Sequence, residues 1–181
     1  MGILKKLWPT LGRDLVLNRI LSSSLIPIPL RWKFYRGIGM KVETSRICPK
    51  VWFGSRNISI GAGTFINYRC VFNTAGGIVI GRNVDIAMDV SFVTSTHEIG
   101  SSGRRAGKST SAPIHVGDGV WIGARAVILP GVSIGDGVII AAGSVVAKDC
   151  QPDTLYAGIP AKPIRSLASQ LVEPAVDRRL D

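Results

Sequence analysis

The segment Ile114–Val146, IHVGDGVWIGARAVILPGVSIGDGVIIAAGSVV, decides the fold of this 181-residue chain. An aliphatic residue recurs in it at every sixth position, and a small or branched residue lies two positions before each one. The same series starts well upstream and comprises Ile60, Ile66, Phe72, Ile80, Ile86, Phe92, Val116, Ile122, Ile128, Ile134, Ile140 and Val146. A six-residue repeat is typical of a parallel β-helix, whose stacked coils bury such side chains against one another.

The series is interrupted at two places, and each interruption adds residues that a regular coil does not need. The first adds two residues around Gly76 and Gly77, and the second is the long stretch 94–113. Within the second, residues 100–111 are rich in glycine and serine and carry three cations, which is typical of a mobile loop. A loop that leaves a rigid scaffold is a common place for functional residues, so we expect the function to depend on this insertion.

The repeat divides the chain into three parts. Residues 1–46 form a basic N-terminal extension, and residues 3–22 carry leucines at helical spacing that Pro27 and Pro29 should end. Residues 47–149 form the β-helix domain with the loop insertion 94–113, and residues 150–181 close the coil, with a short helix expected at Ser166–Val172. The corner residues Asp118 and Asp136 should hydrogen-bond within their own turns. The predicted fold class is all-β.

The net charge of +10 is concentrated in the extension, because residues 1–50 hold ten Lys or Arg against two acids. This surplus suits contact with an anionic membrane surface; capping of the open end of the β-helix is the alternative. Nucleic acid is not expected as a partner, because no recognition motif accompanies the charge. Three cysteines without paired spacing and the lack of a secretory leader predict a cytoplasmic protein, with peripheral contact at the inner face of the membrane.

Three stretches of the sequence carry a resemblance to a family. They are NTAGGIVIG at 73–81, TSTHE at 94–98, and VWIGARAVILPGV at 120–132, which is continued by GSVV at 143–146 and AGIPAKPIR at 157–165. With them, the stretch Ile47–Arg165 resembles the hexapeptide-repeat acyltransferases, in the branch of galactoside and maltose acetyltransferases and of O-acetyltransferases that modify capsules and exopolysaccharides. The resemblance implies a left-handed parallel β-helix, a homotrimer with active sites between neighbouring subunits, and acetyl-CoA as co-substrate.

His97 is the candidate catalytic residue. It lies where the second insertion leaves the coil, whereas His115, the other histidine, lies between two inward positions and should point outward. An imidazole titrates near neutral pH and can take the proton of an acceptor hydroxyl during its attack on a thioester. The position of His97 also matches the catalytic histidine of the resembled family. Direct transfer is expected, because Cys70 points inward and no serine lies in a nucleophile motif.

Two further residues are candidates for substrate binding. Asn67 breaks the rule that a small residue follows each repeat position, and Trp121 is a bulky residue on an outward position. The family has a substrate-contacting asparagine and a pocket-lining tryptophan at these places. A corner role for Asn67 and a packing role between subunits for Trp121 are the structural alternatives.

The resemblance also supplies the residues that would bind acetyl-CoA. Lys and Arg side chains can form charge-assisted hydrogen bonds to the phosphates of acetyl-CoA. The candidates are Ala124 and Ala142 beside the pantetheine arm, and Ala147, Lys148, Lys162 and Arg165 around the phosphate end. No metal is expected, since two histidines are too few for the three-histidine zinc site known on this fold.

The predicted function is acetyl-CoA-dependent O-acetylation of a sugar or polysaccharide-precursor hydroxyl, with His97 as general base. One alternative is an O-acetyltransferase that modifies antibiotics or other xenobiotics. Another is a trimeric β-helix scaffold without catalytic activity. The residues leave the identity of the acceptor open.

Overall fold

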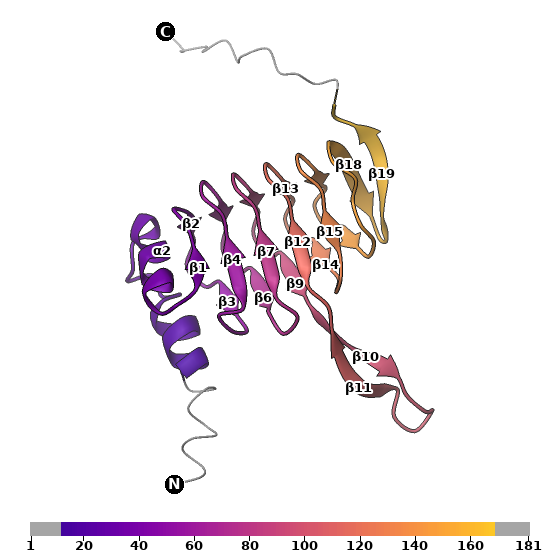
Figure 1. Ribbon diagram of the computed structural model, residues 1–181, viewed down its shortest axis with the longest axis horizontal. Helices are drawn as coiled ribbons and strands as arrows, with labels where there is room; N and C mark the ends of the chain where they lie inside the picture. Colours follow the sequence, from indigo (N-terminus) through magenta and orange to yellow (C-terminus); the bar gives the residue numbers. More distant parts are fainter. Residues whose placement is uncertain (1–11, 169–181) are drawn as a thin grey trace.

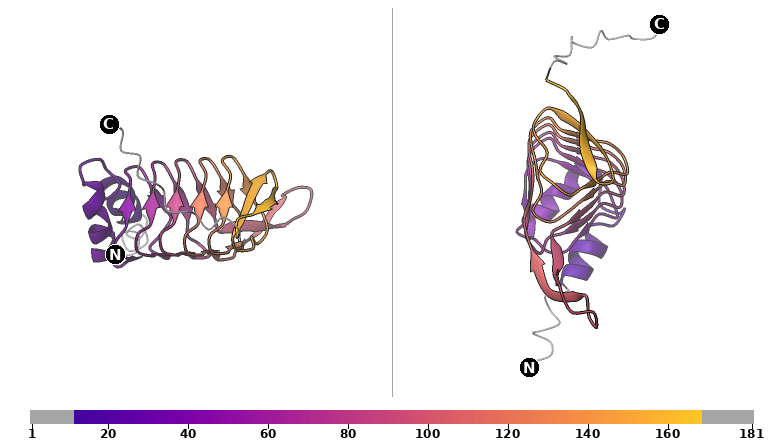
Figure 2. Two further views of the ribbon diagram at one scale, coloured as in Figure 1. Left: turned by 90° about the horizontal axis from the view of Figure 1, so that it is seen from above. Right: turned by 90° about the vertical axis from the view of Figure 1, so that its right-hand side faces the viewer.

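The computed structural model describes residues 12–168. Short parallel strands stack into coils along one axis, with two helices at the N-terminal end and a hairpin that projects from the side (Figure 1). Viewed along the axis, the coils superimpose into one closed outline (Figure 2, right). The all-β parallel β-helix predicted from the six-residue repeat is therefore confirmed.

Three sheets form the sides of the coil, and the chain passes through them in the order A, B, C in each turn. Sheet A contains β1 (Lys41–Val42), β4 (Ile58–Ile60), β7 (Ile78–Ile80), β12 (Ile114–Val116) and β15 (Ser133–Ile134). Sheet B contains β2 (Arg46–Ile47), β5 (Phe65–Ile66), β8 (Asp85–Ile86), β13 (Trp121–Ile122), β16 (Ile139–Ile140), β18 (Thr154–Gly158) and β19 (Ala161–Ser166). Sheet C contains β3 (Trp52–Phe53), β6 (Val71–Asn73), β9 (Ser91–Val93), β14 (Val127–Ile128) and β17 (Val145–Val146).

The repeat residues form the core, as predicted. All twelve are buried, and so are the small or branched residues two positions before them. Equivalent side chains of successive coils lie above one another, and Phe72 stacks between Phe53 and Phe92 with ring-centroid distances of 5.1 and 4.8 Å. Burial of such rings is the largest apolar contribution available to a coil this narrow.

The corner aspartates link coils instead of closing their own turns. The Asp118 carboxylate accepts the backbone N–H of Arg82 at 2.7 Å, and the Asp136 carboxylate accepts the N–H of Asp118 at 2.8 Å. The prediction of a bond within each turn is therefore wrong. The corner of the preceding coil lies directly alongside and offers an N–H that the parallel sheets leave unpaired.

Two helices cover the N-terminal end of the coil (Figure 2, left). A π-helix, η1, spans Gly12–Ile20, and α2 spans Ile28–Gly37. Of the predicted 3–22 helix, residues 3–11 lie outside the described residues, and residues 21–22 form a turn. Pro27 and Pro29 open α2, because the first turn of a helix loses no hydrogen bond to proline. Strand β1 pairs with β4, so sheet pairing already begins within residues 1–46.

The helical end exposes several apolar side chains, among them Leu15, Leu25 and Phe34. No helix in residues 12–168 is long and apolar enough to cross a membrane. Contact of the basic extension with a membrane surface stays a prediction.

The insertion is an antiparallel hairpin of β10 (Ser95–Ile99) and β11 (Ala106–Ser111), whereas its glycine and serine content predicts a mobile loop. Its root is fixed by Thr94, which is buried and donates its hydroxyl to the backbone carbonyl of Asn73 at 2.7 Å. The same hydroxyl accepts the N–H of Gly76 at 2.9 Å. The paired Ser, Thr and His positions satisfy the backbone hydrogen bonds of the two strands. The insertion is therefore ordered by strand pairing despite its glycine content.

The described part of the C-terminal segment contains a hairpin, and the predicted helix at Ser166–Val172 is wrong for its described part. Ser166 is the last residue of β19, Leu167 and Ala168 are not helical, and residues 169–172 lie outside the described part of the chain. Strand β18 continues sheet B beyond β16, and β19 then pairs with β18. Strand β18 thus covers the edge of β16, which would otherwise leave its backbone groups unpaired.

The aromatic stack generates a stability prediction. Phe72→Ala should lower the free energy of unfolding by about 3–5 kcal/mol, because it removes a ring held between two others and leaves a cavity. Ile99→Ala, at a side chain that is 90% exposed, should change it by no more than about 0.5 kcal/mol. Urea denaturation of both variants tests the difference. Equal stability of the two would mean that the stack does not hold the coils together.

Candidate functional site

The hairpin presents His97 on its exposed surface. His97 lies on β10 opposite Ser109, and its Nδ1 is 2.9 Å from the backbone carbonyl oxygen of Gly107. A carbonyl can only accept, so in the neutral ring Nδ1 carries the proton and the lone pair is on Nε2. The backbone of β11 therefore fixes the tautomer in which the outer ring nitrogen can take a proton.

A pocket of about 320 Å³ lies on the outer face of sheet B. Strand register aligns Phe65, Asp85 and Trp121 across three neighbouring strands. The pocket is lined by these three residues together with Asn67, Ile86 and Ala87. Sequence reasoning had selected Asn67 and Trp121, and the structure brings these two together in one cavity.

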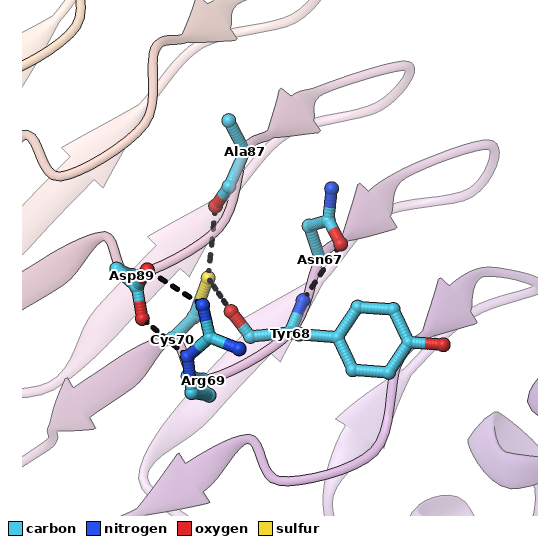
Figure 3. A network of polar contacts seen from close by, with 6 residues as sticks. All are labelled: Asn67, Tyr68, Arg69, Cys70, Ala87 and Asp89. Atoms are coloured by element: carbon cyan, nitrogen blue, oxygen red, sulfur yellow. Dashed lines mark hydrogen bonds and ion pairs between the residues drawn. The ribbon is translucent and has the colours of Figure 1, made fainter.

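Asn67 is oriented by its own corner. Its amide oxygen accepts the backbone N–H of Tyr68 at 2.8 Å, as Figure 3 shows. This bond leaves the amide NH₂ as a donor at the pocket that Asn67 lines. A donor of this kind can stabilise negative charge on a carbonyl oxygen during acyl transfer.

The corner behind the pocket is held by polar contacts between two coils (Figure 3). Arg69 donates two hydrogen bonds to the Asp89 carboxylate, at 2.7 and 2.9 Å, and this contact lowers the pKa of Asp89. The Cys70 thiol donates to the carbonyl of Ala87 at 3.1 Å, and burial raises the pKa of Cys70 to about 12. Cys70 is therefore a protonated core residue, which agrees with the expectation that it is no nucleophile.

The predicted site residues divide between two edges of sheet C. One group lies on sheet B or at the corner between sheets B and C: Asn67, Trp121, Ala124, Ala142, Lys162 and Arg165. The other lies at or beyond the corner between sheets C and A: His97, Ala147 and Lys148. His97 is not among the residues that line the Asn67 pocket. The single chain therefore holds two incomplete halves of the predicted site.

Between the two edges, the outer face of sheet C is mostly apolar. Register aligns Trp52, Val71, Ser91, Val127 and Val145 along it. The equivalent row of sheet A is Lys41, Ser59, Val79, His115 and Ser133. His115 is exposed there, on a different side of the coil from the pocket, as predicted for an outward residue.

Four of the residues predicted to bind acetyl-CoA lie along one edge of the coil. Ala124 and Ala142 lie on successive coils, and the N–H of Gly143 donates to the carbonyl of Ala124 at 2.8 Å. Their small side chains leave the edge open to an extended ligand. Lys162 and Arg165 are exposed on β19, farther along the same edge. In residues 12–168, no three His, Cys, Asp or Glu side chains gather closely enough to hold a metal ion.

Sequence reasoning missed Phe65 and Asp85. Both lie on outward positions that look like ordinary surface residues in the linear sequence. The signal that could have found them is their position in the repeat: each directly precedes a buried repeat residue, as Trp121 does. Residues at this position of successive coils must lie side by side on one sheet.

Comparison with known proteins agrees with this architecture. The family model described as "Bacterial transferase hexapeptide (six repeats)" matches residues 113–148. A maltose O-acetyltransferase from Clostridium difficile is similar, with a TM-score of 0.79 and 32% identity over 92% of this chain and 89% of that one. An acetyltransferase from Vibrio cholerae, solved with acetyl coenzyme A, has a TM-score of 0.78 and 34% identity over 92% and 90% of the two chains.

The chain belongs to the hexapeptide-repeat acetyltransferases. The galactoside O-acetyltransferase of Escherichia coli is 38% identical over 126 residues, which are 69% of this chain and 62% of that protein. Across the curated relatives it matches, the chain spans between 55% and 62% of their length.

The buried thiols give a prediction about nucleophilic chemistry. Burial raises the pKa of Cys70 to about 12 and that of Cys150 to about 11, and it also raises the pKa of Cys48. Below these values the thiols are protonated, so at pH 8 a disulfide reagent should modify none of the three until the protein is unfolded. Counting reacted thiols with and without urea tests this. Rapid modification of Cys70 in the folded protein would reopen a covalent mechanism.

Proposed function

We propose that this protein is an acetyl-CoA-dependent O-acetyltransferase acting on a hydroxyl of a sugar or polysaccharide precursor. The observation that carries the proposal is the hydrogen bond from His97 Nδ1 to the carbonyl of Gly107, which leaves Nε2 free as a base on an exposed hairpin. Membership of the family and the aromatic pocket beside Asn67 support the same conclusion.

The proposed step is a direct transfer. His97 Nε2 takes the proton of the acceptor hydroxyl while the oxygen forms a bond to the acyl carbon of the thioester. Asn67 donates from its NH₂ group to the acyl oxygen as negative charge develops there. The carbon–sulfur bond then breaks, and the imidazolium returns the proton to the sulfur. The products are an acetyl ester and free coenzyme A, and no residue of the protein is acylated.

We infer that the working form is a homotrimer in which each site combines two chains. The two half-sites lie on opposite edges of sheet C, whose outer face is mostly apolar. Packing three such faces around a threefold axis would bury them and bring the His97 edge of one chain to the Asn67 edge of the next. Ala147 and Lys148 would then face Ala124 and Ala142 across the same cleft, as a ligand of acetyl-CoA length requires.

The base is tested by removing it. His97→Ala should lower kcat by about 10²–10⁴-fold, because proton transfer from the acceptor hydroxyl loses its catalyst. Thiol release from acetyl-CoA with a panel of sugar acceptors measures the loss. His115→Ala is the matched control and should turn over like the unaltered protein, since His115 lies on sheet A. If His97→Ala retains full activity, the assignment of the base is wrong; if the unaltered protein acetylates no acceptor, a scaffold role becomes the better explanation.

The shared site is tested by mixing two inactive chains. Trimers made only of His97→Ala or only of Asn67→Ala chains should be nearly inactive. Co-expressed in equal amounts, the two chains should form trimers in which about a quarter of the clefts hold both unaltered residues, and activity should rise accordingly. Separately purified trimers, mixed without exchange of chains, are the control. If co-expression restores nothing while each variant is folded and trimeric, both residues act within one chain.

A further inference from the structure

The pocket on sheet B contains a carboxylate that the proposed transfer does not use. Asp85 is exposed and lies in register between Phe65 on β5 and Trp121 on β13. Neighbouring strands of a sheet are about 4.8 Å apart, so the carboxylate stands between two aromatic side chains. The Asn67 amide lines the same cavity.

No side chain of residues 12–168 neutralises this carboxylate. The two salt bridges in that part of the chain are Arg13–Asp14 and Arg69–Asp89, and Asp85 belongs to neither. The carboxylates at the coil corners, by contrast, have protein donors: Glu43, Asp118, Asp136 and Asp149 each accept a backbone N–H. Asp85 differs from them, because its oxygens are free to bind a group that enters the pocket.

An acidic residue at this position needs a reason. Aspartate is among the residues that strands disfavour, and its neighbours in the row are large and apolar. A carboxylate between two aromatic rings combines an ion pair with cation–π attraction, and this combination favours a small organic cation over a neutral molecule. The face already attracts one cation: the Arg46 guanidinium lies 4.9 Å from the centre of the Phe65 ring.

We propose, on the basis of the function proposed above, that Asp85 selects acceptor sugars that carry a protonated amine. The ammonium group binds the Asp85 carboxylate, and the sugar ring lies against Trp121 and Phe65. An ammonium held in this way has no lone pair, so it cannot attack the thioester. A hydroxyl of the same ring, near Asn67, is therefore the nucleophile, and the product is an O-acetyl ester of an amino sugar.

The test compares three acceptors that share one ring. D-Glucosamine carries the ammonium group, D-glucose replaces it with a hydroxyl, and N-acetyl-D-glucosamine keeps the nitrogen without the charge. The unaltered protein should prefer glucosamine by about tenfold in kcat/KM, which is the effect of one partly exposed charge pair with aromatic support. Asp85→Asn keeps the shape and removes the charge, so it should lower kcat/KM for glucosamine by about tenfold relative to that for glucose and abolish this preference.

Two controls separate the outcomes. Asp136→Asn makes the same chemical change at the corner between sheets A and B and should keep the preference for glucosamine. Hydroxylamine treatment releases acetyl esters but not amides, so it distinguishes O-acetylation from N-acetylation of the product. An amide product, or equal selectivity in the unaltered protein and Asp85→Asn, overturns the role of Asp85. Absence of turnover with every acceptor would instead count against the proposed function itself.

Discussion

Every feature of this protein depends on the stacking of identical positions in successive coils. Parallel strands about 4.8 Å apart place each inward side chain directly against its equivalents above and below, as the Phe53, Phe72 and Phe92 rings show. The same constraint acts on the outward side chains. Because Ile66, Ile86 and Ile122 are aligned inside, the residues before them are aligned outside. The pocket of Phe65, Asp85 and Trp121 is thus a consequence of the core.

Stacking also decides where the chain can depart from the repeat. An insertion within a strand would shift every later residue out of register, whereas an insertion at a corner leaves the coils above and below intact. The hairpin leaves at such a corner, and buried Thr94 bonds it to the preceding coil. His97 lies three residues beyond this anchor. The proposed base therefore lies on an insertion outside the repeat, yet close to an anchor in the core.

The sequence was sufficient for the core and for the two residues, Asn67 and Trp121, that share one pocket, and the failures have physical causes. Inward positions could be predicted because the buried residues are apolar and recur at the same position of every six-residue repeat. The hydrogen-bond partners of the Asp118 and Asp136 carboxylates could not be predicted, because each backbone N–H donor belongs to the preceding coil. The C-terminal hairpin was missed because β18 pairs with β16, which lies in an earlier part of the chain and leaves no signal in the hairpin's own residues. Asp85 was missed because its significance depends on neighbours that lie about twenty and thirty-six residues away in the chain.

The division of the site gives the outer face of sheet C two roles in the proposed trimer. The row of valines and a tryptophan on this face is partly exposed in a single chain, so association would remove apolar surface from water. The same association aligns the two edges that flank this face, because both are fixed to it by strand register. Assembly and the completion of the site are then one event, and no separate conformational change is needed to bring His97 to the pocket. A β-helix is well suited to this arrangement, since its stiffness carries the alignment of the core out to both edges.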